Sequence, residues 1–206
     1  MVTLITSIPL VLLPFVSWPA QATCTMEPVG ATAVEAPILG EFNERVSAYM
    51  QIHESIERTV SPRNTYEDPE ALDEALSAMQ SGIRAKRRGA HVGDIFTADV
   101  SVVIRRRLDE RLAACGLTVE DVLSFINEER HKHVPRPSIN KPFPWALGSA
   151  MPAPLIPALP PLPDHLQYRF ADRDLVLIDI HADLVVDILA NALPAPRRVV
   201  PETHRR

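Results

Sequence analysis

The chain has 206 residues, with 26 acidic and 21 basic side chains and a formal net charge of −5 at pH 7. This mild acidity excludes a general nucleic-acid-binding protein, because such a protein needs a basic face to neutralise phosphates. Twenty prolines and seven glycines are about twice and half the average usage. The prolines are concentrated, so the chain has a helical half and a proline-rich half.

The first 22 residues carry no charged side chain and end in Ala20-Gln21-Ala22. Their apolar run, residues 4–16, has the length of a signal-peptide core, and Ala-x-Ala is a cleavage pattern. Prolines interrupt the run, which is shorter than the roughly 20 apolar residues of a spanning helix. We expect a cleaved signal peptide, a periplasmic or extracellular bacterial protein, and no transmembrane span in the mature chain. A membrane-attached protein that retains this segment is the alternative.

The chain has two cysteines, Cys24 and Cys115. An oxidising compartment permits one disulfide between them. It would join the mature N-terminus to the end of a predicted helix. A buried or free Cys115 with a mobile Cys24 is the alternative, and lipidation of Cys24 is disfavoured by the residues before it.

Apolar residues recur every three or four positions over residues 38–60, which predicts an amphipathic helix. The next helix begins with Asp68 as N-cap and Pro69 in the first position, and it ends before Gly89. Two further helices are expected at 98–115, closed by Gly116, and at 119–132, capped by Thr118. Short connections favour antiparallel packing of these helices into a four-helix bundle.

Residues 134–163 contain ten prolines, a density that excludes a regular α-helix or a central strand. Apolar side chains are interleaved with these prolines. We interpret the segment as a proline-rich strap laid over the helices, with Phe143 and Trp145 as its anchors. A stiff, solvated linker is the alternative.

Alternating apolar residues predict a β-hairpin over residues 166–178, with its turn at Asp172-Arg173. Asp179 is then expected to cap a short last helix at about 180–190. The predicted fold is therefore mainly α: a four-helix antiparallel bundle, a proline-rich strap, and a small C-terminal hairpin plus short helix. The predicted parts are a signal peptide (1–22), a flexible segment (23–36), the bundle (37–133), the strap (134–163), a hairpin–helix unit packed on the bundle (164–193) and a disordered tail (194–206).

Several short runs, in this order along the chain, resemble an uncharacterised family of exported bacterial proteins. They are Gly93-Asp94-Ile95-Phe96-Thr97 before a helix, Arg105-Arg106-Arg107-Leu108 within it, Tyr168-Arg169-Phe170, Asp174-Leu175-Val176-Leu177 and Ala192-Leu193-Pro194. The resemblance spans about half of the chain. It implies a bacterial, exported setting and brings no activity and no functional residues.

Carboxylates and histidines are dense between residues 164 and 187, but no spacing typical of a zinc site repeats there. We interpret them as turn residues, a helix cap and solvated strand faces. His131 and His133 suit a helix C-terminus, and His53 on an apolar stripe suits a hydrogen-bonded core residue. The sequence thus assigns no catalytic residue, no metal ligand and no cofactor.

A basic island lies on the two middle helices of this acidic chain. Its candidate residues for an anionic partner are Arg84, Arg87, Arg88, Arg105 and Arg106. The alternative is that the first three only complement a helix C-terminus, and that consecutive arginines fan around the next helix.

The leading functional interpretation is a non-enzymatic binding or structural module of the bacterial envelope, with an envelope protein or an anionic surface as partner. The alternative is a hydrolase-like or metal-dependent enzyme with its site between the helical bundle and residues 164–187. Convergent carboxylates and histidines in a concave pocket would favour the enzyme.

Overall fold

The computed structural model describes residues 24–60, 69–128, 135–147 and 151–195. In these parts the helices are α1 (Glu35–Glu57), α2 (Pro69–Lys86), α3 (Ala98–Cys115) and α4 (Val119–Asn127), with 3-10 helices η1 (Trp145–Leu147) and η2 (Ala153–Ala158). The strands are β1 (Leu166–Ala171), β2 (Asp174–Asp179) and β3 (Leu184–Leu189). The described chain is therefore mainly helical with a small C-terminal antiparallel sheet. The predicted signal peptide, His131 and His133 lie outside the described residues.

The helix ends follow local signals in the sequence. Pro69 opens α2, and Gly116 ends α3 in a left-handed conformation at φ 63°, where a side chain would be disfavoured. α4 starts with a capping box, in which the Thr118 hydroxyl accepts from the Asp121 N–H and the Asp121 carboxylate accepts from the Thr118 N–H. α3 has the bounds that its apolar spacing predicts, and α1 begins earlier than expected.

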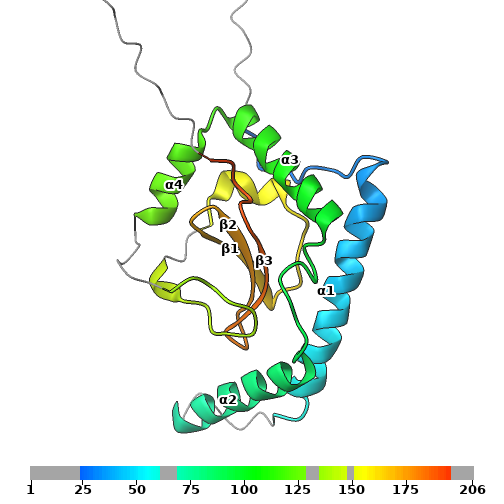
Figure 1. Cartoon of the computed structure of the whole chain (residues 1–206), viewed down its shortest axis with the longest axis vertical. Helices are drawn as coiled ribbons and strands as arrows, with labels where there is room; N and C mark the ends of the chain where they lie inside the picture. Colours follow the sequence, from blue (N-terminus) through cyan, green and yellow to red (C-terminus); the bar gives the residue numbers. More distant parts are fainter. Residues whose placement is uncertain (1–23, 61–68, 129–134, 148–150, 196–206) are drawn as a thin grey trace, which may run out of the picture.

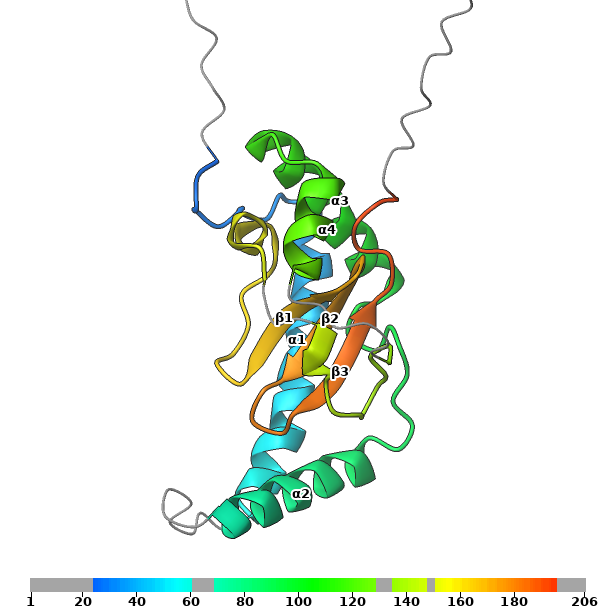
Figure 2. The same ribbon diagram turned by 90° about the vertical axis from the view of Figure 1, so that its left-hand side faces the viewer.

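The helices are arranged around the sheet, with α1 along one side, α2 across its lower end and α3 and α4 at its upper end (Figure 1). Turned by 90°, the molecule shows α1 running behind the strands (Figure 2). α1 packs against both α2 and α3. The antiparallel four-helix bundle is not confirmed, and the boundaries of the predicted parts remain a prediction.

The sheet has the order β1-β2-β3, with both pairs antiparallel, and its central strand β2 is buried on both faces. Leu175 and Leu177 of β2 belong to the large core, together with Phe42 of α1 and Ile104 of α3. The alternate residues Val176 and Ile178 face a second cluster with Phe143. A strand buried on both faces loses the polar alternation of a half-exposed one.

The short last helix expected at 180–190 is wrong: residues 184–189 form strand β3. The run Leu184-Val185-Val186 is apolar, its two valines are β-branched, and all three side chains are buried. Pairing with β2 satisfies their backbone groups, and packing on both faces removes the side chains from water. The hairpin at 166–178 is present, with Asp172 at φ 56° in its turn.

The proline-rich segment contributes side chains to both cores. Phe143 is buried, as is Leu155 in η2, a short 3-10 helix that its prolines allow. Trp145 is wrong as a buried anchor, because 43% of it stays exposed. Its indole N–H donates to Asp183 at 2.9 Å, and its ring packs edge-on against Phe143.

Candidate metal centre

Three histidines and one glutamate meet where α1 passes the end of the β1–β2 hairpin. One ligand atom from each of His53, Glu57, His165 and His181 lies within 4.8 Å of the others. His53 and Glu57 are four residues apart on α1 and so share one face of the helix. Residues far apart in sequence thus converge from one helix and one hairpin.

The hairpin register places the other two histidines together. Leu166 pairs with Asp179 across β1 and β2, so His165 just before β1 lies beside the turn that follows β2. The Ile180 N–H donates to the His165 carbonyl at 2.9 Å and holds these ends together. The His165 and His181 rings stack with their centroids 4.0 Å apart.

The distances inside the cluster suit a small ion. His165 Nδ1 and His53 Nε2 are 2.9 Å apart, while Glu57 lies 3.8 Å from His53 Nε2 and 3.7 Å from His181 Nδ1. Ligand atoms about 2.0–2.2 Å from a tetrahedral zinc ion are separated by roughly 3.3–3.6 Å. The His53–His165 separation is shorter than this range and is a hydrogen-bond distance, the two Glu57 separations are slightly longer, and all four ligand atoms lie within 4.8 Å of one another.

Asp179 orients the buried histidine from behind. Its Oδ2 lies 2.5 Å from His53 Nδ1 and accepts the Tyr49 hydroxyl at 2.6 Å. Its Oδ1 accepts the backbone N–H groups of His181 and Ala182. In the tautomer that donates Nδ1–H to Asp179, His53 presents the lone pair of Nε2 to the cluster, the arrangement of most metal-ligating histidines.

Burial and hydrogen bonds act in opposite directions on the pKa values of Asp179 and His53. Burial opposes ionisation of Asp179, but hydrogen bonds from His53 and Tyr49 outweigh it and lower its pKa. Burial lowers the pKa of His53, and the bond to Asp179 more than reverses this effect, so the pKa is raised. Burial and the Asp179 charge raise the pKa of Tyr49, which therefore remains a donor.

Arg87 adds an outer layer to this support. Its guanidinium lies 5.0 Å from the centroid of the Tyr49 ring and donates to the Val186 carbonyl and the Asn140 side chain. The order from the outside inwards is Arg87, Tyr49, Asp179 and His53. This chain of contacts connects the residue that follows α2 with α1 and β2, behind His53 Nε2.

The five arginines predicted as one anionic-partner patch make contacts at separate places. Arg84 and Arg87 bond to Asn140, Arg105 donates to the carbonyls of Ala190 and Asn191, and Arg106 bonds to Glu35. Arg88 is exposed. Four of the five therefore hold segments of the chain together, a role that the sequence alone does not indicate.

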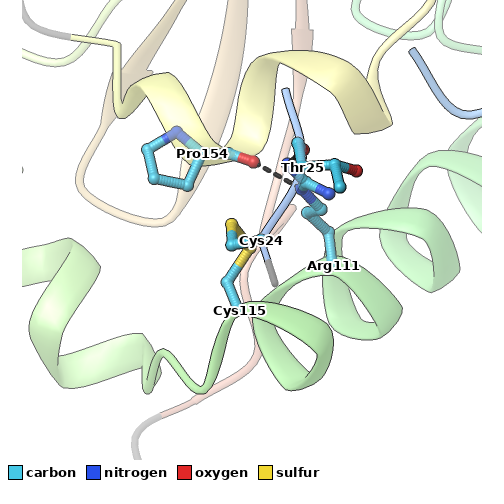
Figure 3. The surroundings of a disulfide bond; sticks show 5 residues. All are labelled: Cys24, Thr25, Arg111, Cys115 and Pro154. Atoms are coloured by element: carbon cyan, nitrogen blue, oxygen red, sulfur yellow. Dashed lines mark hydrogen bonds between the residues drawn. A yellow bond between two sulfur atoms is a disulfide. The ribbon is translucent and has the colours of Figure 1, made fainter. Parts of the chain in front are cut away.

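A disulfide joins Cys24 to Cys115 at the C-terminal end of α3 (Figure 3). Beside it, Arg111 donates to the carbonyls of Pro154 and Thr25. One turn earlier, Arg107 donates to the carbonyls of Val29 and Gly30 and to the buried Glu35. The N-terminal segment, expected to be flexible, is thus attached along α3 from Cys24 onwards.

The Arg107 guanidinium accounts for the unusual acidity of Glu35. Its hydrogen bond is the largest influence and lowers the pKa of Glu35 to about 2, with burial opposing and Thr32 assisting. Glu35 is therefore ionised in the folded protein over the physiological range.

Sequence reasoning misses Glu57 and interprets the three histidines without a ligand role. The spacing of His53 and Glu57 by four residues on a predicted helix is the one local signal that points to a shared site. Asp179 is wrong as a helix cap, because it is the last residue of β2 and is fully buried.

No family model, curated protein or solved structure matches this chain. In the described ranges, no helix combines the length and the apolar character needed to cross a membrane.

Proposed function

We propose that this chain is an exported binding module whose ligand is a divalent transition-metal ion of the zinc class. The observation that carries the proposal is the convergence of His53, His165 and His181 with the Glu57 carboxylate alongside. Imidazole nitrogen suits zinc and its neighbours in the first transition row, whereas calcium and magnesium prefer an all-oxygen shell. The proposal departs from the sequence, which assigns no metal ligand.

The support behind His53 is the second argument for binding. A buried carboxylate that fixes one ring nitrogen leaves the other pre-oriented, so little ordering is needed when the ion arrives. His165 Nδ1 lies 2.9 Å from the other ring nitrogen of His53, and one ligand atom of each of the three histidines lies within 4.8 Å of the others, so three imidazoles share one small volume.

Metal-free protein dialysed against Zn²⁺ is expected to retain about one ion per chain, measured by elemental analysis after buffer exchange. His165→Ala is expected to weaken binding by at least 100-fold, because it removes one of three nitrogen ligands. His165 is only partly buried, so the variant is expected to fold, as far-UV circular dichroism checks.

The matched control is His91→Ala, which removes an exposed histidine outside the cluster. It is expected to bind zinc like the unaltered chain. Cobalt substitution adds a geometric readout, because a tetrahedral Co²⁺ site absorbs strongly in the visible range. Zinc retention that is equal in all three proteins, or absent from all three, contradicts the proposal.

Export is part of the proposal and is supported by two features. The N-terminal segment ends in Ala20-Gln21-Ala22, and the Cys24–Cys115 disulfide suits an oxidising compartment. Intact-mass analysis of protein recovered from a bacterial periplasm or culture medium is expected to show a chain that starts at Thr23. A mass that includes Met1 contradicts cleavage and favours the membrane-attached alternative.

A further inference from the structure

A groove of about 520 Å³ opens beside the histidine cluster, between α2 and the turn after β2. It shares Glu57 and His181 with the cluster. Its apolar lining comes from Val60, Leu72, Leu76, Met79 and Ile180. A cavity of this volume is in the range that holds small organic ligands.

The cluster is closed on one side and open on the other. His53 is fully buried against Asp179, whereas the side chains of Glu57 and His181 are 47% and 50% exposed on the groove side. Structural zinc sites are closed by four protein ligands, and catalytic sites keep one position for water. The open side is therefore where a water molecule and a second ligand have access.

The Glu57 carboxylate lies farther from the nearest histidine nitrogens than His53 and His165 lie from each other. It is 3.7–3.8 Å from two histidine nitrogens, whereas the nitrogens of His53 and His165 are 2.9 Å apart. A carboxylate at this distance can accept a hydrogen bond from a water molecule held by an ion among the three rings. With an ion bound, three histidines and a neighbouring carboxylate would provide both parts needed for hydrolysis, the activated water and its proton acceptor.

We infer that this centre, if it binds zinc as proposed above, hydrolyses acyl compounds seated in the groove. With an ion held by the three histidines, a bound water would give one proton to Glu57, and its oxygen would form a bond to the carbonyl carbon. The bond from that carbon to the leaving oxygen or nitrogen then breaks, and the leaving group takes the proton from Glu57. The products are a carboxylic acid and an alcohol or amine, with no oxidant or reductant involved.

The groove lining defines the substrate class. Leu72, Leu76 and Met79 offer an apolar wall for an acyl chain. Asp73 and Asp183 also line the groove, and their charges disfavour anionic substrates such as phosphate esters. The inferred substrate is an ester or amide with an apolar acyl group and no negative charge.

The experiment measures zinc content and hydrolysis in the same samples, with p-nitrophenyl hexanoate as probe and p-nitrophenyl phosphate as anionic comparison. Zinc-loaded protein is expected to hydrolyse the hexanoate at least 10-fold faster than metal-free protein, and the phosphate no faster than buffer containing zinc. Glu57→Gln is expected to retain zinc and to lose about 100-fold in kcat, the effect typical of removing a general base. Leu72→Glu, at a position 52% exposed, is expected to raise KM for the hexanoate with kcat retained.

Glu54→Gln is the matched control, because Glu54 lies on the same helix outside the cluster and the groove. It is expected to keep full activity. Zinc bound at one ion per chain without zinc-dependent hydrolysis overturns this inference and leaves metal binding intact. Activity unchanged in Glu57→Gln, or zinc lost from that variant, overturns the role of Glu57, and absence of zinc from the unaltered chain overturns both proposals.

Discussion

Asp187→Ala is expected to lower the free energy of unfolding by about 4 kcal/mol, because one buried carboxylate organises a whole loop. Its Oδ1 accepts the N–H of Gly93, and its Oδ2 accepts the N–H groups of Ile95 and Phe96, at 2.7–2.8 Å. Hydrogen bonds to a charged group contribute about 1.5–3 kcal/mol each, and buried donors without partners are costly. The alanine variant leaves three long-range donors without this acceptor.

The effect of this substitution extends into the core. The loop held by Asp187 carries Phe96, which is buried and stacks on Phe42 of α1 with ring centroids 6.0 Å apart. Losing the loop geometry therefore disturbs the packing between α1 and the sheet. Asp187→Asn is expected to fall between alanine and the unaltered chain, because one amide oxygen replaces two carboxylate oxygens.

Urea unfolding followed by circular dichroism measures the loss. The control is Asp174→Ala, which removes a carboxylate that accepts one exposed N–H, from Asn191. This control is expected to cost about 1 kcal/mol or less. Equal midpoints for Asp187→Ala and Asp174→Ala would show that the loop is held by other contacts.

The helical part of the fold is predictable because its signals are local. These signals are Pro69 at the start of α2, Thr118 before α4 and Gly116 after α3. Each affects backbone groups within one turn of the helix end. A pattern over three to seven residues contains this information. Where the helices lie relative to one another depends on contacts between distant segments, whereas the short connections in the sequence favour a bundle from loop length alone.

The C-terminal part shows where local patterns become ambiguous. Residues 184–189 are a short apolar run, which periodicity alone does not assign to helix or strand. The second face of the sheet is covered by residues from the proline-rich segment, Phe143 and Leu147 among them. That cover explains why β2 and β3 lack polar alternation, and it comes from a segment in which no regular structure is expected.

The candidate metal centre was predictable only in its helical half. His53 and Glu57 are local neighbours, but His165 is 112 residues away from His53, and the contact exists because the hairpin register places it there. The density of histidines and carboxylates in residues 164–187 points to the segment that contains His165 and His181. It does not point to their partners in the cluster, because His53 and Glu57 lie on α1. Asp179 in that segment orients a ligand from another element and is unsuited to be one itself.

Removing the disulfide with Cys24→Ala and Cys115→Ala together is expected to cost about 2–5 kcal/mol. The two cysteines are 91 residues apart, so the bond closes a long loop and restricts the unfolded chain strongly. In the folded protein the N-terminal segment keeps other attachments, since Arg107 donates to the carbonyls of Val29 and Gly30. The loss is therefore expected to arise mainly in the unfolded state, with the native fold retained.

Because the loss of stability is expected to arise in the unfolded state, the native structure is expected to stay the same. The double variant is expected to keep the far-UV spectrum and the zinc stoichiometry of the unaltered chain, because Cys24 and Cys115 lie at the C-terminal end of α3 and outside the histidine cluster. Its urea midpoint is expected to fall, and a reducing agent is expected to lower the midpoint of the unaltered chain to the same value without affecting the variant. A midpoint that neither change lowers would mean that the disulfide contributes no stability, and two titratable thiols in the oxidised protein would mean that it does not form.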